Sequence, residues 1–282
     1  MTTNTEVRLD IAVQHHLSSI SRATAAKLIE DSLVKVNGRI VPKPSFKISG
    51  DDKLEISYNP NKIKIPKIIL PIIYEDRDVL VTNKPIGVLS HSKGEYNPEA
   101  TVASWLANKY DGPKNDRSGI VHRLDRSTSG VMILAKNEAA AKWLQKQFST
   151  RKVKKTYLAI ISGHLNYESA VIDLPLRRNP KNPQSFKVDP NGKKALTEYS
   201  VLKSNDLYSL IELKPTTGRT HQLRVHLSHL GHPIVGDNLY HGKPADRLYL
   251  LAKKLEITLP SKERKIFEVD TPNEFKILIS HE

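Results

Sequence analysis

The sequence predicts an α+β protein in two parts, a small N-terminal module and a larger domain built on a mixed, mainly antiparallel sheet. Helical periodicity and a hairpin signal fill the first 58 residues. After residue 71, short apolar runs typical of strands alternate with two helical stretches. Residues 59–70, rich in proline and lysine, suit an extended linker with a short strand. We therefore expect a module at 1–58, a linker at 59–70 and a domain at 71–282.

In the small module, two helices should lead into a hairpin. The apolar spacing of residues 9–17 predicts the first helix, and Ser21 can cap a second that continues to Ile29. Asn37 and Gly38 stand between two apolar pairs. Both accept positive φ, so the pair predicts a tight hairpin turn.

The larger domain should open with a hairpin and end beyond a helix rich in histidine. The predicted elements are, in order, a hairpin at 72–85, a helix at 101–108, a buried strand at 131–135, a helix at 138–148, a strand at 156–163, a long exposed segment at 174–194, antiparallel strands at 195–201 and 208–213, and a helix from residue 220.

The charge of the chain favours a polyanionic partner. It carries 44 Lys and Arg against 30 Asp and Glu, a net charge of +14. Such a field concentrates RNA or DNA. An anionic membrane would also attract it, but the apolar runs are too short to span a bilayer and no basic amphipathic anchor is present. We therefore expect no membrane association.

The absence of cysteine excludes disulfides, thiol catalysis and cysteine-bound zinc. The N-terminal residues lack the charged and apolar regions of a secretory signal, so we expect the protein in the cytoplasm. Four histidines lie between residues 221 and 232, but their spacing is not that of a zinc site, so we expect no metal.

The most informative stretch is residues 119–136, in which Asp125 lies between Arg123 and Arg126 in a polar turn before a buried strand. Two cations beside the carboxylate should favour its ionised form, which suits a nucleophile or a base. Taken alone, an Arg-x-Asp-Arg sequence is more often a solvated surface turn.

The residues around Asp125 favour a reactive carboxylate over a solvated surface turn. His122-Arg123-Leu124-Asp125 followed by Thr128-Ser129-Gly130 resembles the catalytic-aspartate motif of RluA-type RNA pseudouridine synthases. A kinase is excluded because Leu124 separates arginine from aspartate and the chain has no Asp-Phe-Gly.

Two further segments carry the same resemblance. Residues 155–159 resemble the family's Lys-x-Tyr-x-Ala motif, which implies that Tyr157 lies in the active site against the base. Residues 216–237 resemble a third motif, which implies that Arg224 pairs with Asp125 and that Arg219 braces the turn or holds phosphate. Helical spacing should place Arg224 on a polar side of its helix. Residues 250–255 lack the histidines that the family has there.

The small module resembles the S4 RNA-binding domain. This resemblance makes four residues candidates for contact with RNA phosphates: Ser21, Arg22, Lys27 and Lys35. The resemblance to the pseudouridine synthases implies, in addition, a basic loop near RNA within the exposed segment at 174–194. Each residue alone is as consistent with a solvated side chain, since only clustering of cations is informative.

Together the resemblances imply the pseudouridine synthase fold and an isomerase that needs no cofactor. Asp125 would act at the ribose, either adding to C1′ or removing a proton from C2′. Tyr157 would stack on the base and help remove the C5 proton, Arg224 would hold Asp125, and Arg123 would fill the stack left by a flipped uridine. We expect ribosomal RNA as substrate rather than transfer RNA, and a monomer. The alternatives are an RNA-binding protein without catalysis and a phosphodiesterase.

Overall fold

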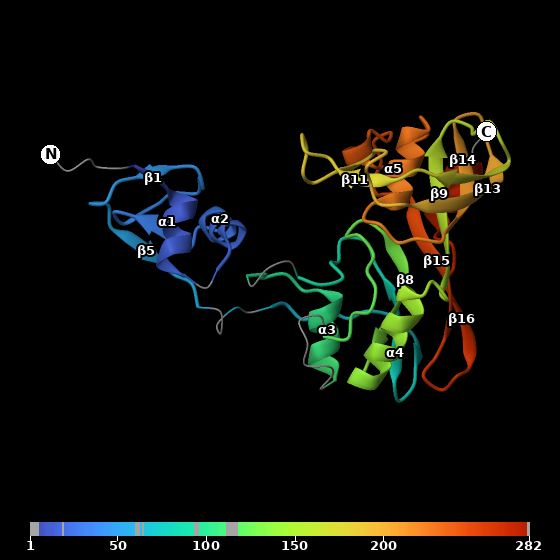
Figure 1. Cartoon of the computed structure of the whole chain (residues 1–282), viewed down its shortest axis with the longest axis horizontal. Coiled ribbons are helices and arrows are strands. Elements are labelled where there is room, and N and C mark those ends of the chain that lie inside the picture. The colour runs from blue at the N-terminus through green and yellow to red at the C-terminus, as the bar shows by residue number, and fades with distance from the viewer. Residues whose placement is uncertain are drawn as a thin grey trace. The chain divides into compact units, whose positions relative to one another are not determined.

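The computed structural model describes residues 6–18, 20–59, 63, 65–92, 96–110 and 118–280. They form two compact units (Figure 1), one drawn from 1–67 with 92–100 and the other from 68–91 with 101–282. Each unit has its own apolar core. None of the described helices is long and apolar enough to cross a membrane. The exact domain boundaries given above stay a prediction.

The small unit has the predicted order of two helices followed by a hairpin. Its elements are β1 (Val7–Arg8), α1 (Leu9–His16), α2 (Arg22–Glu30), β2 (Val34–Val36), β3 (Arg39–Ile40), β4 (Lys47–Ile48) and β5 (Leu54–Ile56). Ser21 caps α2 by accepting a hydrogen bond from the Thr24 N–H. Asn37 and Gly38 have φ angles of 50° and 77°, which confirms the turn between β2 and β3.

One segment of the small unit comes from a distant part of the sequence. Tyr96 is buried in the small core and packs edge-on against Tyr58, with ring centroids 5.7 Å apart. The Lys27 ammonium lies 5.6 Å from the Tyr96 ring centroid. We did not predict that Tyr96 joins this core, because a single buried tyrosine has no periodicity.

The large unit contains a mixed, mainly antiparallel sheet, as predicted, and helices lie on both of its faces. Its strands are β6 (Ile72–Glu75), β7 (Val79–Lys84), β8 (Ser129–Ala135), β9 (Lys154–Ser162), β10 (Ser169–Asp173), β13 (Leu196–Ser204), β14 (Tyr208–Pro215), β15 (Leu250–Thr258) and β16 (Arg264–Glu268), with a separate hairpin of β11 (Leu176–Arg178) and β12 (Phe186–Val188). Its helices are α3 (Val102–Lys109), α4 (Glu138–Ser149), α5 (Gln222–His229), the short 3-10 helix η2 (Asn238–Tyr240) and α6 (Asn273–Ser280).

The order of the strands in the main sheet brings distant parts of the chain together. Among the described residues the order is β10-β13-β14-β9-β15-β8-β7-β6, and β16 pairs with β15. β8 and β15 run parallel, and the other described neighbours are antiparallel. β15 thus lies between β8 and β9.

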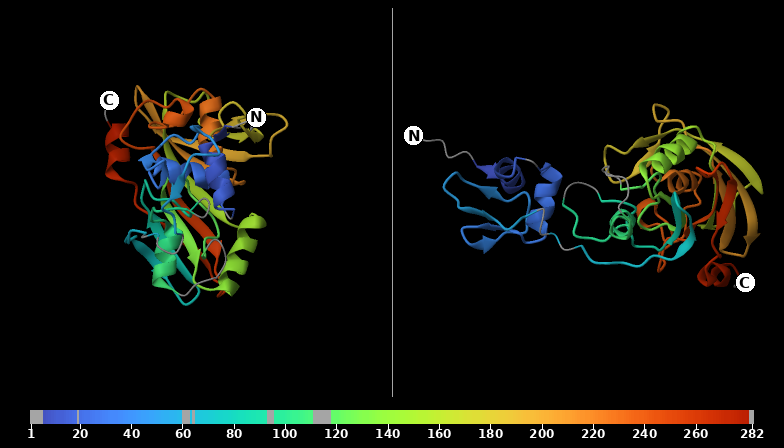
Figure 2. Two further views of the ribbon diagram at one scale, coloured as in Figure 1. Left: turned by 90° about the vertical axis from the view of Figure 1, so that its left-hand side faces the viewer. Right: turned by 90° about the horizontal axis from the view of Figure 1, so that it is seen from below.

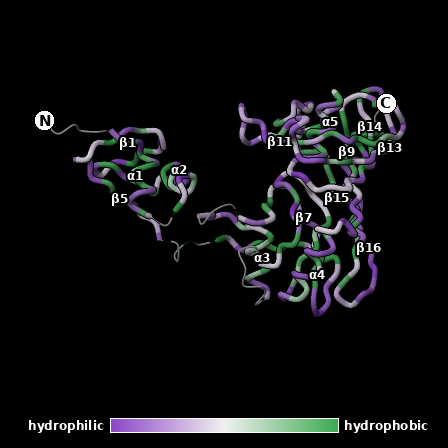
Figure 3. The backbone as a smooth tube through the Cα atoms, viewed as in Figure 1, coloured by the Kyte–Doolittle hydropathy of each residue, from purple (hydrophilic) through white to green (hydrophobic). Residues whose placement is uncertain are grey.

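The sheet is covered on both faces in the region of β7 and β8. All of β8 is buried; Val131 and Ile133 face the core that includes α4, whereas Met132 and Leu134 face the core that includes α3. The sheet is bent, with α4 and α5 on its inner side (Figure 2). Apolar residues concentrate along the strands and the helix faces that meet them (Figure 3). Burial on both faces explains the unbroken apolar run in the sequence.

The expected exposed segment at 174–194 contains the β11–β12 hairpin, which we did not predict. Leu176 of β11 is buried in a small core with Ala195, Val225 and Tyr240. Single apolar residues such as Leu176 and Phe186, separated by proline, asparagine and lysine, are enough to anchor this hairpin to the core. The described residues of the expected linker contain no strand.

One row of residues crosses the three central strands. Ala252 of β15 pairs with Gly130 of β8 on one side and with Tyr157 of β9 on the other. Gly130 has a φ of +120°, and a Cβ there would overlap the backbone of Ala252. Only glycine lets the two strands approach this closely.

His122 anchors the segment before β8 and does not point to solvent. Its Nε2 accepts a hydrogen bond from the Ile133 N–H at 3.1 Å, and its ring stacks on Phe148 at 4.6 Å. Burial lowers the pKa of His122 to about 3, so its imidazole is neutral in the fold.

We expect Gly130→Ala to lower the free energy of unfolding of the large domain by about 3 kcal/mol or more, because backbone strain adds to the overlap with β15. Gly87→Ala is the matched control. Gly87 has a φ of +82° but open space where a Cβ would lie, so this change should cost only about 1 kcal/mol. Urea unfolding followed by the fluorescence of Trp105 and Trp143, both in the large unit, measures each loss. Equal losses would contradict the role of close strand packing.

We expect His122 to make the fold acid-sensitive. An unfolded histidine binds a proton below about pH 6.5, whereas His122 in the fold does so only near pH 3, so stability is complete above about pH 6.5 and falls as the pH drops through this window. The limiting slope is about 1.4 kcal/mol per pH unit. His122→Gln keeps an acceptor for Ile133 but does not titrate, so its free energy of unfolding should fall less steeply. Identical slopes in unfolding experiments across this range would refute the prediction.

Candidate active site

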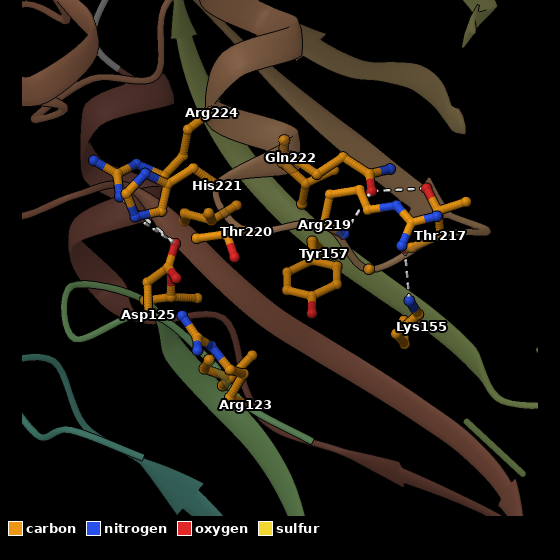
Figure 4. Close-up of a pocket in the computed structure, with 15 residues that line it drawn as sticks. Arg123, Asp125, Lys155, Tyr157, Thr217, Arg219, Thr220, His221, Gln222 and Arg224 are labelled. Atoms are coloured by element: carbon orange, nitrogen blue, oxygen red, sulfur yellow. Dashed lines mark hydrogen bonds and ion pairs between the residues drawn. The ribbon is translucent and has the colours of Figure 1, made fainter. Parts of the chain in front are cut away.

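The predicted residues of the large domain meet in one pocket of about 170 Å³. Three segments form it: the turn before β8, the start of β9, and the loop that leads into α5, with Leu250 of β15 also lining it. Figure 4 shows Asp125 below His221 and Arg224, with the Tyr157 ring beside them. Residues far apart in sequence are therefore brought together, because β15 joins β8 to β9.

The turn that carries Asp125 is held at the residues on both of its sides. Ser90 Oγ donates to the Leu124 carbonyl at 2.7 Å and accepts from the Leu124 N–H at 3.0 Å. Lys84, fully buried, donates to the Arg126 carbonyl at 3.3 Å and to two carbonyls of its own turn. Burial lowers the pKa of Lys84 to about 8, while Asp125 acts in the opposite direction. Lys84 and Ser90 thus hold the backbone on either side of Asp125, and no pattern in the sequence singled out these two residues.

A cation from α5 lies beside Asp125, in addition to the arginines that flank Asp125 in the sequence. Arg224 Nη1 lies 3.5 Å from Asp125 Oδ2, and His221 Nε2 lies 3.8 Å from the same oxygen. Arg126 donates to the Gly87 carbonyl at 3.3 Å. Asp125 therefore also has a cationic contact from across the fold, which the expectation based on the adjacent arginines did not include.

Arg224 is buried on the side of α5 that the helical spacing predicts to be polar, where Arg224, His221 and Ser228 all contact Tyr240. Its Nε and Nη2 donate to the two carboxylate oxygens of Asp237, each at 2.7 Å. Leu223 and Val225 lie in different cores on either side of α5, and this explains why the helix has no solvated face here. We missed Asp237, although a buried arginine requires a counterion and Asp237 ends the same motif-bearing stretch.

Tyr157 and Lys155 lie two residues apart on β9 and line the same pocket. Burial first, and then the Asp125 charge, raises the pKa of Tyr157 well above its ordinary value, so its phenol stays protonated. Lys155 Nζ donates to the Thr217 carbonyl at 2.9 Å, and burial lowers its pKa to about 8. The uncharged ring of Tyr157 and the Lys155 side chain thus line the same pocket as the Asp125 carboxylate.

Arg123 and Arg219 are exposed at the rim of the pocket. The Arg219 N–H donates to Gln222 Oε1 at 3.0 Å and its Nε donates to the Lys194 carbonyl at 3.1 Å, so this residue braces the turn into α5. Gln222 also accepts from Thr217, which fixes the loop between β14 and α5.

The four RNA-binding candidates of the small unit differ in the contacts that they make within the protein. Ser21 caps α2, and the Arg22 guanidinium donates to Asp10 at 3.1 Å. Lys27 lies over Tyr96, whereas Lys35 is exposed on β2. Lys35 is therefore the most accessible of these charges.

The histidines of the third motif have separate partners. His221 contacts Tyr240 and Asp125, His226 contacts Thr197 and the Leu174 carbonyl, and His232 contacts the Ser162 carbonyl. Within the described ranges, no three His, Asp or Glu side chains form a group that fits a metal ion.

Family comparison agrees with this geometry. Residues 78–229 match the RNA pseudouridylate synthase family, and residues 7–54 match the S4 domain.

Two curated relatives cover nearly the whole chain. An uncharacterized RNA pseudouridine synthase of Aquifex aeolicus is 37% identical over 295 positions, covering 98% of this chain and 93% of the relative. A ribosomal large subunit pseudouridine synthase D of Borreliella burgdorferi is also 37% identical, covering 98% and 89%. The Escherichia coli K12 protein of the same name is 36% identical and covers 84% and 73%.

Solved structures show the same fold. Human RNA pseudouridylate synthase domain containing 1 superposes with a TM-score of 0.61 at 34% identity, covering 73% of this chain and 84% of that one. Human RNA pseudouridylate synthase domain containing 4 gives a TM-score of 0.59 at 30% identity, covering 73% and 90%. The protein therefore belongs to the RNA pseudouridylate synthase family and carries an S4 domain ahead of its synthase domain.

Proposed function

We propose that this chain converts specific uridines of large-subunit ribosomal RNA to pseudouridine. The relatives from Borreliella burgdorferi and Escherichia coli are named ribosomal large subunit pseudouridine synthase D. The S4 domain and the net charge of +14 support a structured RNA as the substrate.

The observation that carries the proposal is the meeting of Asp125, Tyr157 and Arg224 in one pocket. Pseudouridine formation breaks the bond from uracil N1 to ribose C1′, turns the base, and joins C5 to C1′. The enzyme therefore needs an anionic group at the sugar and a surface that retains the detached base.

Asp125 is the group that acts at the ribose in this proposal, by adding to C1′ or by taking a proton from C2′. Arg224 orients the carboxylate, since its Nη1 lies 3.5 Å from Asp125 Oδ2 while its Nε and Nη2 donate to Asp237.

Tyr157 holds the base by stacking. Because its phenol stays protonated, Tyr157 is poorly suited to accept the C5 proton, a role that would require a phenolate. Of its two expected roles, stacking on the base and removal of the C5 proton, our proposal keeps stacking. Burial of its ring against the sheet gives a rigid surface for a planar base.

The arginines at the rim would bind the RNA around the flipped uridine. Arg123 would fill the stack that the uridine leaves, and Arg219 would contact a neighbouring phosphate. In the small unit, Ser21, Arg22, Lys27 and Lys35 would contact RNA phosphates. The net positive charge makes all these contacts sensitive to salt.

Three other functions remain to be separated by experiment: RNA binding without catalysis, modification of transfer RNA, and phosphodiester cleavage. The presence of Asp125, Tyr157 and Arg224 in one pocket weighs against RNA binding without catalysis. The separate partners of His226 and His232 weigh against phosphodiester cleavage. RNA that stays intact during incubation would exclude cleavage.

We expect Asp125→Asn to lower the rate of pseudouridine formation by at least about 100-fold, the lower range for a group that acts in the reaction, while RNA binding persists. Carbodiimide mapping of ribosomal and transfer RNA incubated with purified protein measures the product and identifies the substrate. Asp206→Asn, an exposed change in the turn between β13 and β14, is the control and should act as wild type. Wild-type protein that binds RNA but marks none would favour the binding function instead.

We expect Lys35→Gln to weaken RNA binding and to reduce the slope of log affinity against log salt concentration by about 0.7–0.9, the value for one released counterion. Arg22→Gln should change the slope less, because the Arg22 guanidinium already lies against Asp10. Fluorescence anisotropy with a ribosomal RNA fragment at several salt concentrations gives both slopes. A larger effect of Arg22→Gln would reverse our ranking of the two side chains.

A further inference from the structure

A chain of polar contacts runs from the β11–β12 hairpin to Asp125. The Phe186 N–H donates to the Tyr240 hydroxyl oxygen at 2.9 Å, and this hydroxyl lies 2.8 Å from His221 Nδ1. His221 Nε2 lies 3.8 Å from Asp125 Oδ2. Neither His221 nor Tyr240 has a role in the function proposed above.

The direction of these contacts fixes the proton on His221. The Tyr240 oxygen already accepts from Phe186, and burial raises the pKa of Tyr240 to about 12, so its own proton is present and needs an acceptor. His221 Nδ1 is the acceptor within reach at 2.8 Å. A neutral imidazole that accepts at Nδ1 carries its proton on Nε2, which faces the carboxylate.

The surroundings of His221 keep the ring neutral and in place. Burial lowers the pKa of His221, Asp125 and Asp237 oppose this shift, and Arg224 and Arg123 add to it. The ring packs edge-on against Phe186 and Tyr240, with interplanar angles of 77° and 85°. The residue has a φ of 57°, a left-handed conformation that is uncommon for histidine and frequent at functional sites.

His221 and Arg224 both approach the same carboxylate oxygen of Asp125. Contact with one oxygen from two sides fixes the plane of the carboxylate and leaves the other oxygen to face the substrate. A separation of 3.8 Å is longer than a hydrogen bond, but contacts of this kind often shorten when substrate closes the site.

We propose that His221 is a positioning residue for Asp125, with its Nε2–H directed at Oδ2 and its tautomer set by the Tyr240 hydroxyl. This inference rests on the proposed function, because it assigns His221 a part in aiming the carboxylate that acts at the ribose. Its expected signature is a loss of kcat with little change in KM.

Two substitutions at residue 221 separate positioning from a purely structural role. His221→Gln places an amide N–H near the position of Nε2, whereas His221→Asn reaches only the position of Nδ1. Asparagine tolerates positive φ better than glutamine, so stability alone would favour the Asn variant. We expect the opposite order for catalysis, with kcat near wild type for His221→Gln. For His221→Asn we expect kcat to fall on the order of tenfold to 100-fold, the loss typical of residues that orient a reacting ligand without contacting the substrate.

The activity assay uses the full chain and the RNA that carbodiimide mapping identifies, with urea unfolding of each variant alongside. His229→Gln, the same change on an exposed histidine at the far end of α5, is the control and should leave kcat unchanged. Tyr240→Phe should lower kcat in the same way as His221→Asn, since it removes the donor to Nδ1. If activity follows stability, with Asn equal to or better than Gln, the positioning role is wrong.

A second measurement does not depend on activity. Long-range ¹H–¹⁵N spectra of histidine-labelled protein, assigned by the signal missing from His221→Gln, report which ring nitrogen carries the proton. We expect the Nε2–H tautomer in wild type and a mixture in Tyr240→Phe; an Nδ1–H tautomer in wild type would overturn the inference. Failure of the wild-type chain to form pseudouridine would overturn the proposed function, while these spectra would still decide the tautomer.

Discussion

The buried ion pair between Arg224 and Asp237 is the interaction on which the site depends. A lone arginine on a buried helix would carry an uncompensated charge, and a full salt bridge with Asp125 would tie up the carboxylate. Asp237 takes Nε and Nη2 and leaves Nη1 for Asp125. The Asp237 loop is in turn shaped by Gly236, which has a φ of +78° and no room for a Cβ beside the Arg247 backbone.

The sheet positions two other parts of the site, the Asp125 turn and the Tyr157 ring. Lys84 and Ser90 hold the Asp125 turn by hydrogen bonds to its backbone. The paired residues Gly130, Ala252 and Tyr157 set the separation between this turn and the Tyr157 ring. Asp125 and Tyr157 therefore lie on a rigid scaffold. The charged groups that approach Asp125 come from the other side, on α5 and the loop before it.

The fold class and the main site residues could be predicted because their signals are local. Asn37-Gly38 requires a tight turn, an unbroken apolar run requires a strand buried on both faces, and the short motifs around Asp125, Tyr157 and Arg224 lie on one segment each. The parts that we missed depend on distant contacts. Asp237 is recognisable as a partner only once Arg224 is known to be buried, and Tyr96 joins the small core with no pattern in the residues around it. The β11–β12 hairpin likewise depends on Tyr240, more than 50 residues away.

The position of β15 also governs the order in which the large domain can be completed during synthesis. β8 and β9 are made early, but they do not pair with each other in the sheet: β15, which begins at residue 250, must enter between them. A nascent chain that ends before this strand has two separate groups of strands with unpaired edges. Because non-local strand pairing is slow, the pocket with Leu250 in its wall forms only after β15 has left the ribosome.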